Sequence, residues 1–181
     1  LQPYSYFLVV ARLEPENNIE TILKGYLLSD RETHCPLIVV GKTDTPHGKY
    51  LVGKYGGEKS VRFVGGIYDF DKLNSLRHFS SAYFHGHSVG GTNPSLLEAM
   101  ASGSFIVASD NVFNASVLRG DALYFSSDAD VCTIINSLEA ETEAKRDTFV
   151  ANNLERIKTA YSWEKLTDEH EQYFLEILNK E

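Results

Sequence analysis

YFLVVARLEPENNIETILKGYLLS, residues 6–29, passes from a continuous apolar run straight into an amphipathic segment. The run at 6–12 has the composition of a parallel strand that is buried on both faces. Residues 18–29 repeat their apolar side chains at helical spacing, and this set consists of Ile19, Ile22, Leu23, Tyr26 and Leu27. The stretch therefore predicts a buried strand followed by an amphipathic helix.

The same alternation recurs along the rest of the chain. A second amphipathic helix is predicted at 70–81, and its apolar face consists of Phe70, Leu73, Leu76 and Phe79. Further buried strands are predicted at 36–41, 61–65, 82–86, 105–109 and 122–125. A strand and a helix repeated about six times are typical of an open, doubly wound α/β domain. We therefore expect one Rossmann-like domain over residues 1–181, with a parallel sheet of about six strands.

The last segment, residues 162–180, predicts a longer amphipathic helix that begins after Ser162 as the N-cap. Its apolar stripe consists of Trp163, Leu166, Tyr173, Phe174 and Ile177. The whole chain has 181 residues, which is enough for one well-packed core and short for two.

Composition and charge narrow the classes of partner. The 17 basic and 25 acidic residues give a net charge of −8, which disfavours non-specific binding to nucleic acid or to acidic membranes. An anionic ligand would therefore need a local site. The two cysteines, Cys35 and Cys132, show neither disulfide nor metal spacing and favour a reduced, cytoplasmic compartment. No apolar run reaches the ~20 residues of a membrane span, and residues 1–10 lack the features of a signal peptide.

Ligands of doubly wound sheets bind beyond the carboxyl ends of the strands, so the loops after the strands are the candidate site. Arg12 follows the first strand, where its guanidinium could bind a phosphate through two N–H groups. The alternative is a surface ion pair with Glu14 or Glu16. After the second strand, the GKT at 41–43 is not a P-loop, because position 36 holds proline where that motif needs glycine. Lys42 is expected to lie in an exposed turn.

The loop after the fourth strand leads into a sharply defined helix start. Asn93 followed by proline is a strong N-terminal signal. Gly90, Gly91 and Thr92 before it allow backbone amides to approach an anion at the positive end of the helix. Glu98, further along the helix, could accept hydrogen bonds from ribose hydroxyls, as acidic residues do in dinucleotide folds. Its alternative is an acid that merely suits the start of a helix.

Two histidines precede this loop. His85 and His87 lie two residues apart and are expected to face the same side of the strand end. A metal site would need further ligands, and no acid lies at a useful spacing. We therefore predict a structural or ligand-contacting role for this pair and no metal site.

Four stretches of the sequence, taken together, can be compared with known protein families. They are FLVVARLEPENNIETILKGY (7–26), VRFVGGIYDFDKLNSL (61–76), NPSLLEAMASGSFIVASD (93–110) and YSWEKLTDEHEQYF (161–174). In order and spacing they resemble the C-terminal, donor-binding domain of family 4 glycosyltransferases with the GT-B fold. The resemblance covers essentially the whole chain.

The resemblance implies a nucleotide-diphosphate sugar as donor substrate, with no metal and no other cofactor. Arg12 matches the arginine that binds the diphosphate, and Glu98 matches the glutamate that binds the ribose, so these two would carry the chemistry. The base would lie near Gly66, Ile67 and Tyr68. The residues implied around the donor are Arg12, Gly66, Ile67, Tyr68, Gly90, Gly91, Thr92, Asn93 and Glu98.

The chain departs from the family pattern at three places. Gly90 replaces the first glutamate of the paired motif, which leaves the stereochemistry and the contacts to the sugar open. Asn17 replaces a lysine that binds the diphosphate, and Lys42 or a residue of another domain could substitute for it. NVFNASV at 111–117 replaces a glycine-rich turn and a glutamate.

The resemblance also implies the wider function. The GGTNPS variant at 90–95 is similar to a bacterial subgroup that includes rhamnosyltransferase-like enzymes of surface-polysaccharide assembly. We expect transfer to a glycan or lipid-linked acceptor held by an N-terminal domain that residues 1–181 do not contain. That domain could bring the protein to the inner face of the membrane, and an exposed apolar patch is expected near Trp163. Two alternatives stay open: a non-catalytic nucleotide-sugar binding module and a nucleotide-sugar epimerase on the same fold.

Overall fold

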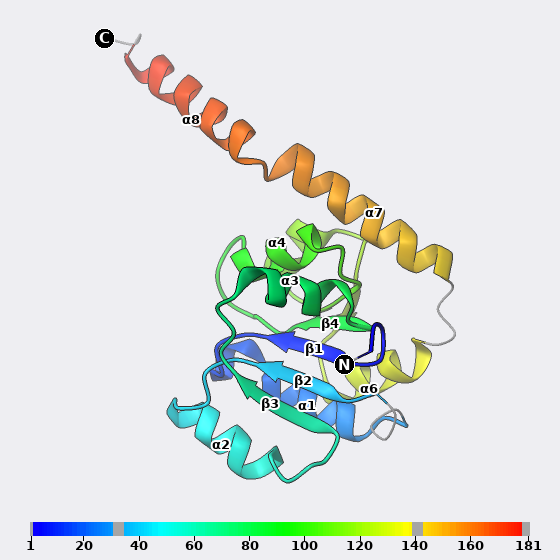
Figure 1. Cartoon of the computed structure of the whole chain (residues 1–181). Helices are drawn as coiled ribbons and strands as arrows, with labels where there is room; N and C mark the ends of the chain where they lie inside the picture. Colours follow the sequence, from blue (N-terminus) through cyan, green and yellow to red (C-terminus); the bar gives the residue numbers. More distant parts are fainter. Residues whose placement is uncertain (1, 31–34, 139–142, 179–181) are drawn as a thin grey trace.

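The described chain forms a six-stranded, all-parallel sheet (Figure 1). A computed structural model describes residues 2–30, 35–138 and 143–178. The strand order is β3-β2-β1-β4-β5-β6, as in a Rossmann sheet. The strands are β1 (Phe7–Val10), β2 (Leu37–Val40), β3 (Val61–Gly65), β4 (Ala82–His85), β5 (Ile106–Ser109) and β6 (Leu123–Phe125). The predicted fold class is confirmed, and each strand lies within or next to its predicted run.

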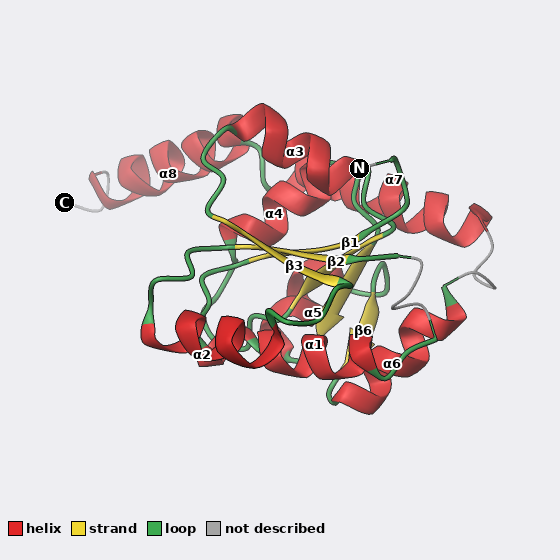
Figure 2. Ribbon diagram, turned by 60° about the horizontal axis from the view of Figure 1, so that its bottom comes forward, coloured by secondary structure: helices red, strands yellow, loops and turns green. Residues whose placement is uncertain are grey.

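Helices cover both faces of the sheet (Figure 2). Helices α1 (Ile19–Leu27), α2 (Pro46–Tyr55) and α6 (Asp128–Ser137) lie on one face. The other face carries α3 (Phe70–His78), α4 (Pro94–Ala101) and α7 (Glu143–Ala160). Helix α5 (Val112–Leu118) packs into the same cluster as α3 and α4. A 3-10 turn, η1 (Pro15–Asn17), precedes α1, and α8 (Trp163–Leu178) ends the described chain.

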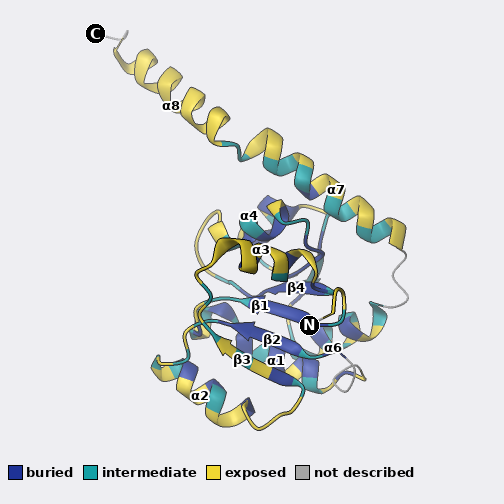
Figure 3. Ribbon diagram, in the orientation of Figure 1, coloured by how far each residue is buried: buried dark blue, intermediate teal, exposed yellow. Residues whose placement is uncertain are grey.

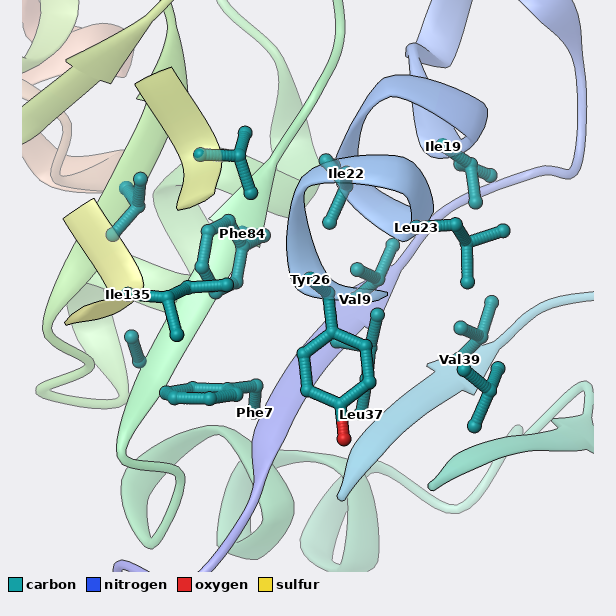
Figure 4. Packing of buried hydrophobic residues seen from close by; sticks show 14 of the residues in the cluster. Phe7, Val9, Ile19, Ile22, Leu23, Tyr26, Leu37, Val39, Phe84 and Ile135 are labelled. Atoms are coloured by element: carbon teal, nitrogen blue, oxygen red, sulfur yellow. The ribbon is translucent and has the colours of Figure 1, made fainter. Parts of the chain in front are cut away.

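Two apolar clusters, one on each side of the sheet, make the core. Phe7 and Val9 of β1 point into the cluster with α1 and α6, whereas Leu8 points to the side of α3 and α4. Figure 4 shows the first of these clusters around Tyr26. Both faces of the central strands are therefore buried, as their continuous apolar runs predict.

The edge strand β3 differs from this prediction. Val61 is buried, but Arg62 and Val64 are exposed, so one face of the strand is open. Successive side chains of a strand point to opposite faces, so more buried and more exposed residues alternate along β3.

The helices also differ in detail from the sequence analysis. Helix α3 ends at His78 rather than at 81. The helix packs on the sheet through Leu73 and Leu76, whereas Phe70 at its start is 68% exposed and Phe79 beyond its end is also exposed. Helix α2 begins right after the Lys42 turn, because the Thr45 hydroxyl accepts a hydrogen bond from Gly48 N at 3.0 Å.

The C-terminal part contains two helices rather than one. Helix α7, which was not predicted, packs against α4. Helix α8 begins after Ser162, whose hydroxyl accepts a hydrogen bond from Lys165 N at 3.2 Å, so the predicted cap is confirmed. The predicted helix end at 180 lies outside the described residues.

Helix α8 extends away from the sheet and buries none of its residues (Figures 1 and 3). Trp163 at its start is 82% exposed. The predicted stripe is open to solvent throughout: Trp163, Leu166, Tyr173, Phe174 and Ile177. The expectation of an exposed apolar patch is therefore confirmed. None of the helices in the described ranges is both long enough and apolar enough to span a membrane.

A cluster of polar side chains joins α1 to α2. The Glu20 carboxylate accepts hydrogen bonds from Lys54 Nζ at 2.8 Å, Tyr50 OH at 2.9 Å and Tyr55 OH at 3.0 Å. The bond from Lys54 is the largest cause that lowers the pKa of Glu20 to about 2. The ionised carboxylate is thus the form that the folded chain favours.

Replacement of this carboxylate should change the pH dependence of stability. Because the pKa of Glu20 is about 2 when folded and about 4.3 when unfolded, its contribution is present above pH ~4.3 and is lost as the pH falls towards ~2. Urea unfolding should show the wild type more stable than Glu20→Gln at pH 7, with a gap that narrows through this range. Glu58→Gln, which removes an exposed carboxylate outside this cluster, should keep the wild-type profile. A gap independent of pH would contradict the assignment.

Candidate functional site

A crevice opens at the carboxyl ends of the central strands. The strand order reverses between β1 and β4, which is the point where doubly wound sheets bind ligands. A cavity of about 480 Å³ lies there. Its lining includes Arg12, Lys42, Tyr68, Arg77, His87 and Glu98.

The structure brings together some of the predicted residues and not others. Arg12, Gly66, Ile67, Tyr68 and Glu98 all line the crevice, although they come from two separate loops and a helix.

The glycine loop does not line this crevice. Gly90, Gly91 and Asn93 are absent from its walls, and Thr92 faces a separate groove between α4 and α8. Gly90 has φ 98°, a left-handed conformation that disfavours the glutamate of the family pattern. The Asn93 side chain accepts a hydrogen bond from Ser95 N at 2.9 Å, which confirms the predicted cap of α4.

The loops after β1 and β4 are held against each other. Asn18 Nδ2 donates to Gly86 O at 2.9 Å, and both the amide and the hydroxyl of Ser88 donate to Glu16 O, at 3.0 and 2.8 Å. Gly86 lies so close to the carbonyl of Asn17 that a Cβ would overlap it. These contacts fix one wall of the crevice to the next.

Asn17, at the position of the family lysine, has a structural role. Its side chain is buried, and Nδ2 donates to Arg12 O at 2.8 Å. This bond fixes the backbone from which the Arg12 side chain leaves. A lysine head group could not remain buried in this place without an anionic partner.

The Arg12 side chain itself is open to solvent. It is 81% exposed, and its Nη2 lies 3.7 Å from Glu16 Oε1. The predicted surface ion pair therefore exists, with Glu16 rather than Glu14. Such an exposed pair contributes only ~0–1 kcal/mol, so an incoming anion can replace it.

Glu98 has an ionic partner that the sequence did not reveal. Arg77 of α3 is buried, with 1% of its side chain exposed, and its Nη2 lies 2.6 Å from Glu98 Oε2. The two residues lie 21 positions apart. In the sequence, Arg77 looks like an ordinary polar residue of an amphipathic helix, so no local signal points to it.

The two histidines stack beside the crevice. The ring centroids of His85 and His87 lie 4.3 Å apart with an interplanar angle of 13°. Burial is the main cause that lowers the pKa of His85, and it lowers the pKa of His87 to about 4. Both rings are therefore neutral at pH 7. Within the described ranges, no three His, Cys, Asp or Glu side chains gather to hold a metal ion.

The NVFNASV segment at the start of α5 braces the same loop. Asn111 Nδ2 and Asn114 Nδ2 donate to His87 O at 3.1 and 3.0 Å, and both also donate to Ser109 O. This departure from the family pattern therefore connects β5 to the loop after β4.

The fold and the site define a class first: a doubly wound domain with a crevice at its switch point that can hold an anion and a polyol. Comparison with known proteins then gives the family. Residues 2–147 match the family described as Glycosyl transferases group 1, and the chain belongs to this family. The fold is that of the C-terminal half of a GT-B glycosyltransferase.

The chain is similar to several longer proteins. An uncharacterized glycosyltransferase of Methanocaldococcus jannaschii is 31% identical over 178 residues, which cover 94% of this chain and 45% of that protein. Sucrose-phosphate synthase of Thermosynechococcus elongatus superposes with a TM-score of 0.82 at 19% identity, over 98% of this chain and 46% of that one. The chain thus spans about half the length of these relatives.

Two further solved structures share the fold. HepE of Anabaena, crystallised in complex with UDP and glucose, gives a TM-score of 0.81 at 16% identity, over 96% of this chain and 49% of that one. The C-terminal domain of a glycosyl transferase group 1 family protein, LpcC of Francisella tularensis, gives 0.71 at 17% identity, over 90% and 89% of the two chains.

The close approach of Gly86 yields a test of the crevice wall. A methyl group in Gly86→Ala would overlap Asn17 O, so we expect a loss of ~1–3 kcal/mol in the free energy of unfolding. Gly53→Ala in α2, where a Cβ meets nothing within 4 Å, should be neutral or stabilising by up to ~1 kcal/mol. Urea unfolding of the two variants measures this. Equal stability of Gly86→Ala and the wild type would show that the two loops are not held in this way.

Proposed function

We propose that this chain is the donor-binding domain of a family 4 glycosyltransferase, and that the crevice holds a nucleotide-diphosphate sugar. The observation that carries the proposal is the convergence of Arg12 and Glu98 on one cavity at the switch point of the sheet. A guanidinium suits a diphosphate, and a carboxylate suits vicinal ribose hydroxyls.

The diphosphate would extend from Arg12 in the crevice towards the loop before α4, which lies outside the crevice walls. Arg12 is exposed and bound only loosely to Glu16, so its guanidinium is free to turn to a phosphate. The amides of residues 90–93 donate no hydrogen bond to the described part of the chain, and they precede the positive end of α4. Arg12 and these amides would also offset the charge of the leaving diphosphate, without need of a metal.

The base and the ribose would occupy the wall formed by the loop after β3 and by α4. Gly66, Ile67 and Tyr68 line the same crevice as Arg12, and we expect them to contact the base. Glu98 would accept the ribose hydroxyls from the opposite side. HepE, a neighbour of the same fold, was crystallised with UDP, which supports a nucleotide as the class of ligand.

Lys42 is our candidate for the second cation that the family pattern places at Asn17. It lines the crevice from the loop after β2 and forms no ion pair with the described residues. Its flexible side chain can follow a phosphate as a point charge.

The complete reaction would need an acceptor domain. We propose that the sugar passes to a glycan or lipid-linked acceptor, as in bacterial surface-polysaccharide assembly, with a hexosyl or deoxyhexosyl group such as rhamnose as the unit transferred. The left-handed glycine at position 90 removes the carboxylate that usually contacts the sugar. That same feature favours a non-catalytic nucleotide-sugar binding module as the second candidate function.

Calorimetric titration with UDP, GDP, dTDP and ADP tests the donor site. We expect at least one of them to bind below the millimolar range. Arg12→Gln should weaken that binding by about tenfold or more, because the diphosphate loses a charged hydrogen-bond donor worth ~1.5–3 kcal/mol.

Arg62→Gln is the matched control, because it removes the same charge from the exposed face of β3, outside the crevice. It should bind within about twofold of the wild type, since distant surface charges are largely screened by salt. Absence of binding for all four nucleotides, or equal losses in both variants, would refute the donor site. If the donor site stands, transfer assays on a protein that also contains the proposed acceptor domain would separate an enzyme from a binding module.

A further inference from the structure

Arg77 lies buried beneath the crevice and holds Glu98. Its Nη2 donates to Glu98 Oε2 at 2.6 Å and lies 3.4 Å from Ser95 Oγ, while Nη1 donates to Asn74 Oδ1 at 3.2 Å. Only 1% of the arginine side chain is exposed. A buried guanidinium thus reaches from α3 to a carboxylate on α4.

Glu98 is held at one oxygen and open at the other. Its side chain is 41% exposed and lines the crevice. Oε1 accepts no hydrogen bond from the described residues, whereas Oε2 is bound to Arg77. One carboxylate oxygen is therefore fixed and the second is available to a ligand.

Further hydrogen bonds hold the ion pair between Arg77 and Glu98 in place. Ser95, which lies beside Nη2, shares a hydrogen bond of 2.9 Å with Tyr83 OH, and Tyr83 OH donates to Val10 O at 3.3 Å. Tyr83 is fully buried in β4, and Val10 ends β1. Hydrogen bonds through Arg77, Ser95 and Tyr83 thus connect Glu98 to the two central strands, β1 and β4.

Stability alone does not account for this pair. Arg77 Nε is buried and has no partner in the described part of the chain. Arg156 of α7 differs, because it donates to Asp121, Asn153 and the carbonyls of Val117 and Leu118. Removing one partner of a buried ion pair is costly, but replacing both partners by apolar residues is often neutral. A buried arginine that lacks one hydrogen-bond partner therefore contributes little net stability.

We propose that Arg77 is the positioning residue of the donor site. It fixes the Glu98 carboxylate so that Oε1 meets the ribose hydroxyls. The inference rests on the proposed function. In this proposal, the preference for ribose over deoxyribose depends on Arg77, which itself need not touch the ligand.

The test compares ribonucleoside diphosphates with their deoxy forms. UDP, GDP and ADP are titrated by calorimetry alongside their 2′-deoxy and 3′-deoxy forms, and the ratio of dissociation constants gives the ribose preference. The wild type should prefer the ribo form by about tenfold or more. Arg77→Met and Glu98→Gln should each lower this preference by about threefold or more, while the deoxy forms keep their affinity within about twofold.

Arg156→Met is the matched control. Arg156 lies 2.6 Å from Asp121 in a partly buried ion pair that is not part of the crevice. This variant should unfold at lower urea concentration and keep the wild-type ribose preference. The contrast matters because a merely structural role of Arg77 would weaken the ribo and deoxy forms equally.

The outcomes separate the two proposals. If the wild type binds none of the nucleotides, the proposed function fails, and the inference fails with it. If Glu98→Gln abolishes the ribose preference but Arg77→Met keeps it, the donor site stands and the role of Arg77 is refuted. Where Arg77→Met does not fold, Arg77→Lys decides in the same assay: its ammonium keeps the charge but not the planar fork, so the preference should fall. An unchanged preference in Arg77→Lys would overturn the inference.

Discussion

The backbone contact between Gly86 and Asn17 is the constraint on which the crevice depends. β1 and β4 are neighbours in the sheet although α1, β2, α2, β3 and α3 lie between them in the chain. Their loops can meet only because position 86 has no side chain to hold them apart. Hydrogen bonds from Ser88 and Asn18 then hold the two loops together. The Arg12 loop and the start of α4 thereby face one cavity.

The electrostatics of the site follow from local arrangement rather than from net charge. The chain carries a charge of −8, which opposes an anion at long range. At the crevice, however, Arg12 and Lys42 are exposed, and the amides of residues 90–93, in the loop outside its walls, donate no hydrogen bond to the described residues. The one carboxylate of α4 that lines the cavity, Glu98, is balanced by the buried Arg77. An acidic protein can thus present a cationic pocket.

Sequence reasoning recovered what local patterns encode. The central strands, the caps of α4 and α8, and the convergence of Arg12 and Glu98 follow from periodicity, capping chemistry and the geometry of parallel sheets. The exposed face of β3 and the separate helix α7 were missed, because both depend on which helices cover which part of the sheet. Arg77 was missed for the same kind of reason: its partner lies on another helix, and burial of an arginine leaves no periodic trace.

The departures from the family pattern acquire physical roles in the fold. Asn17 fixes the backbone of Arg12, and Asn111 and Asn114 brace the carbonyl of His87. The central claim is that this braced crevice seats a nucleotide diphosphate. A crystal structure of the chain with UDP tests it most directly. The account predicts the diphosphate between Arg12 and the amides of residues 90–93, with the ribose on Glu98 Oε1. A diphosphate bound elsewhere, with Arg12 still turned to Glu16, would contradict it.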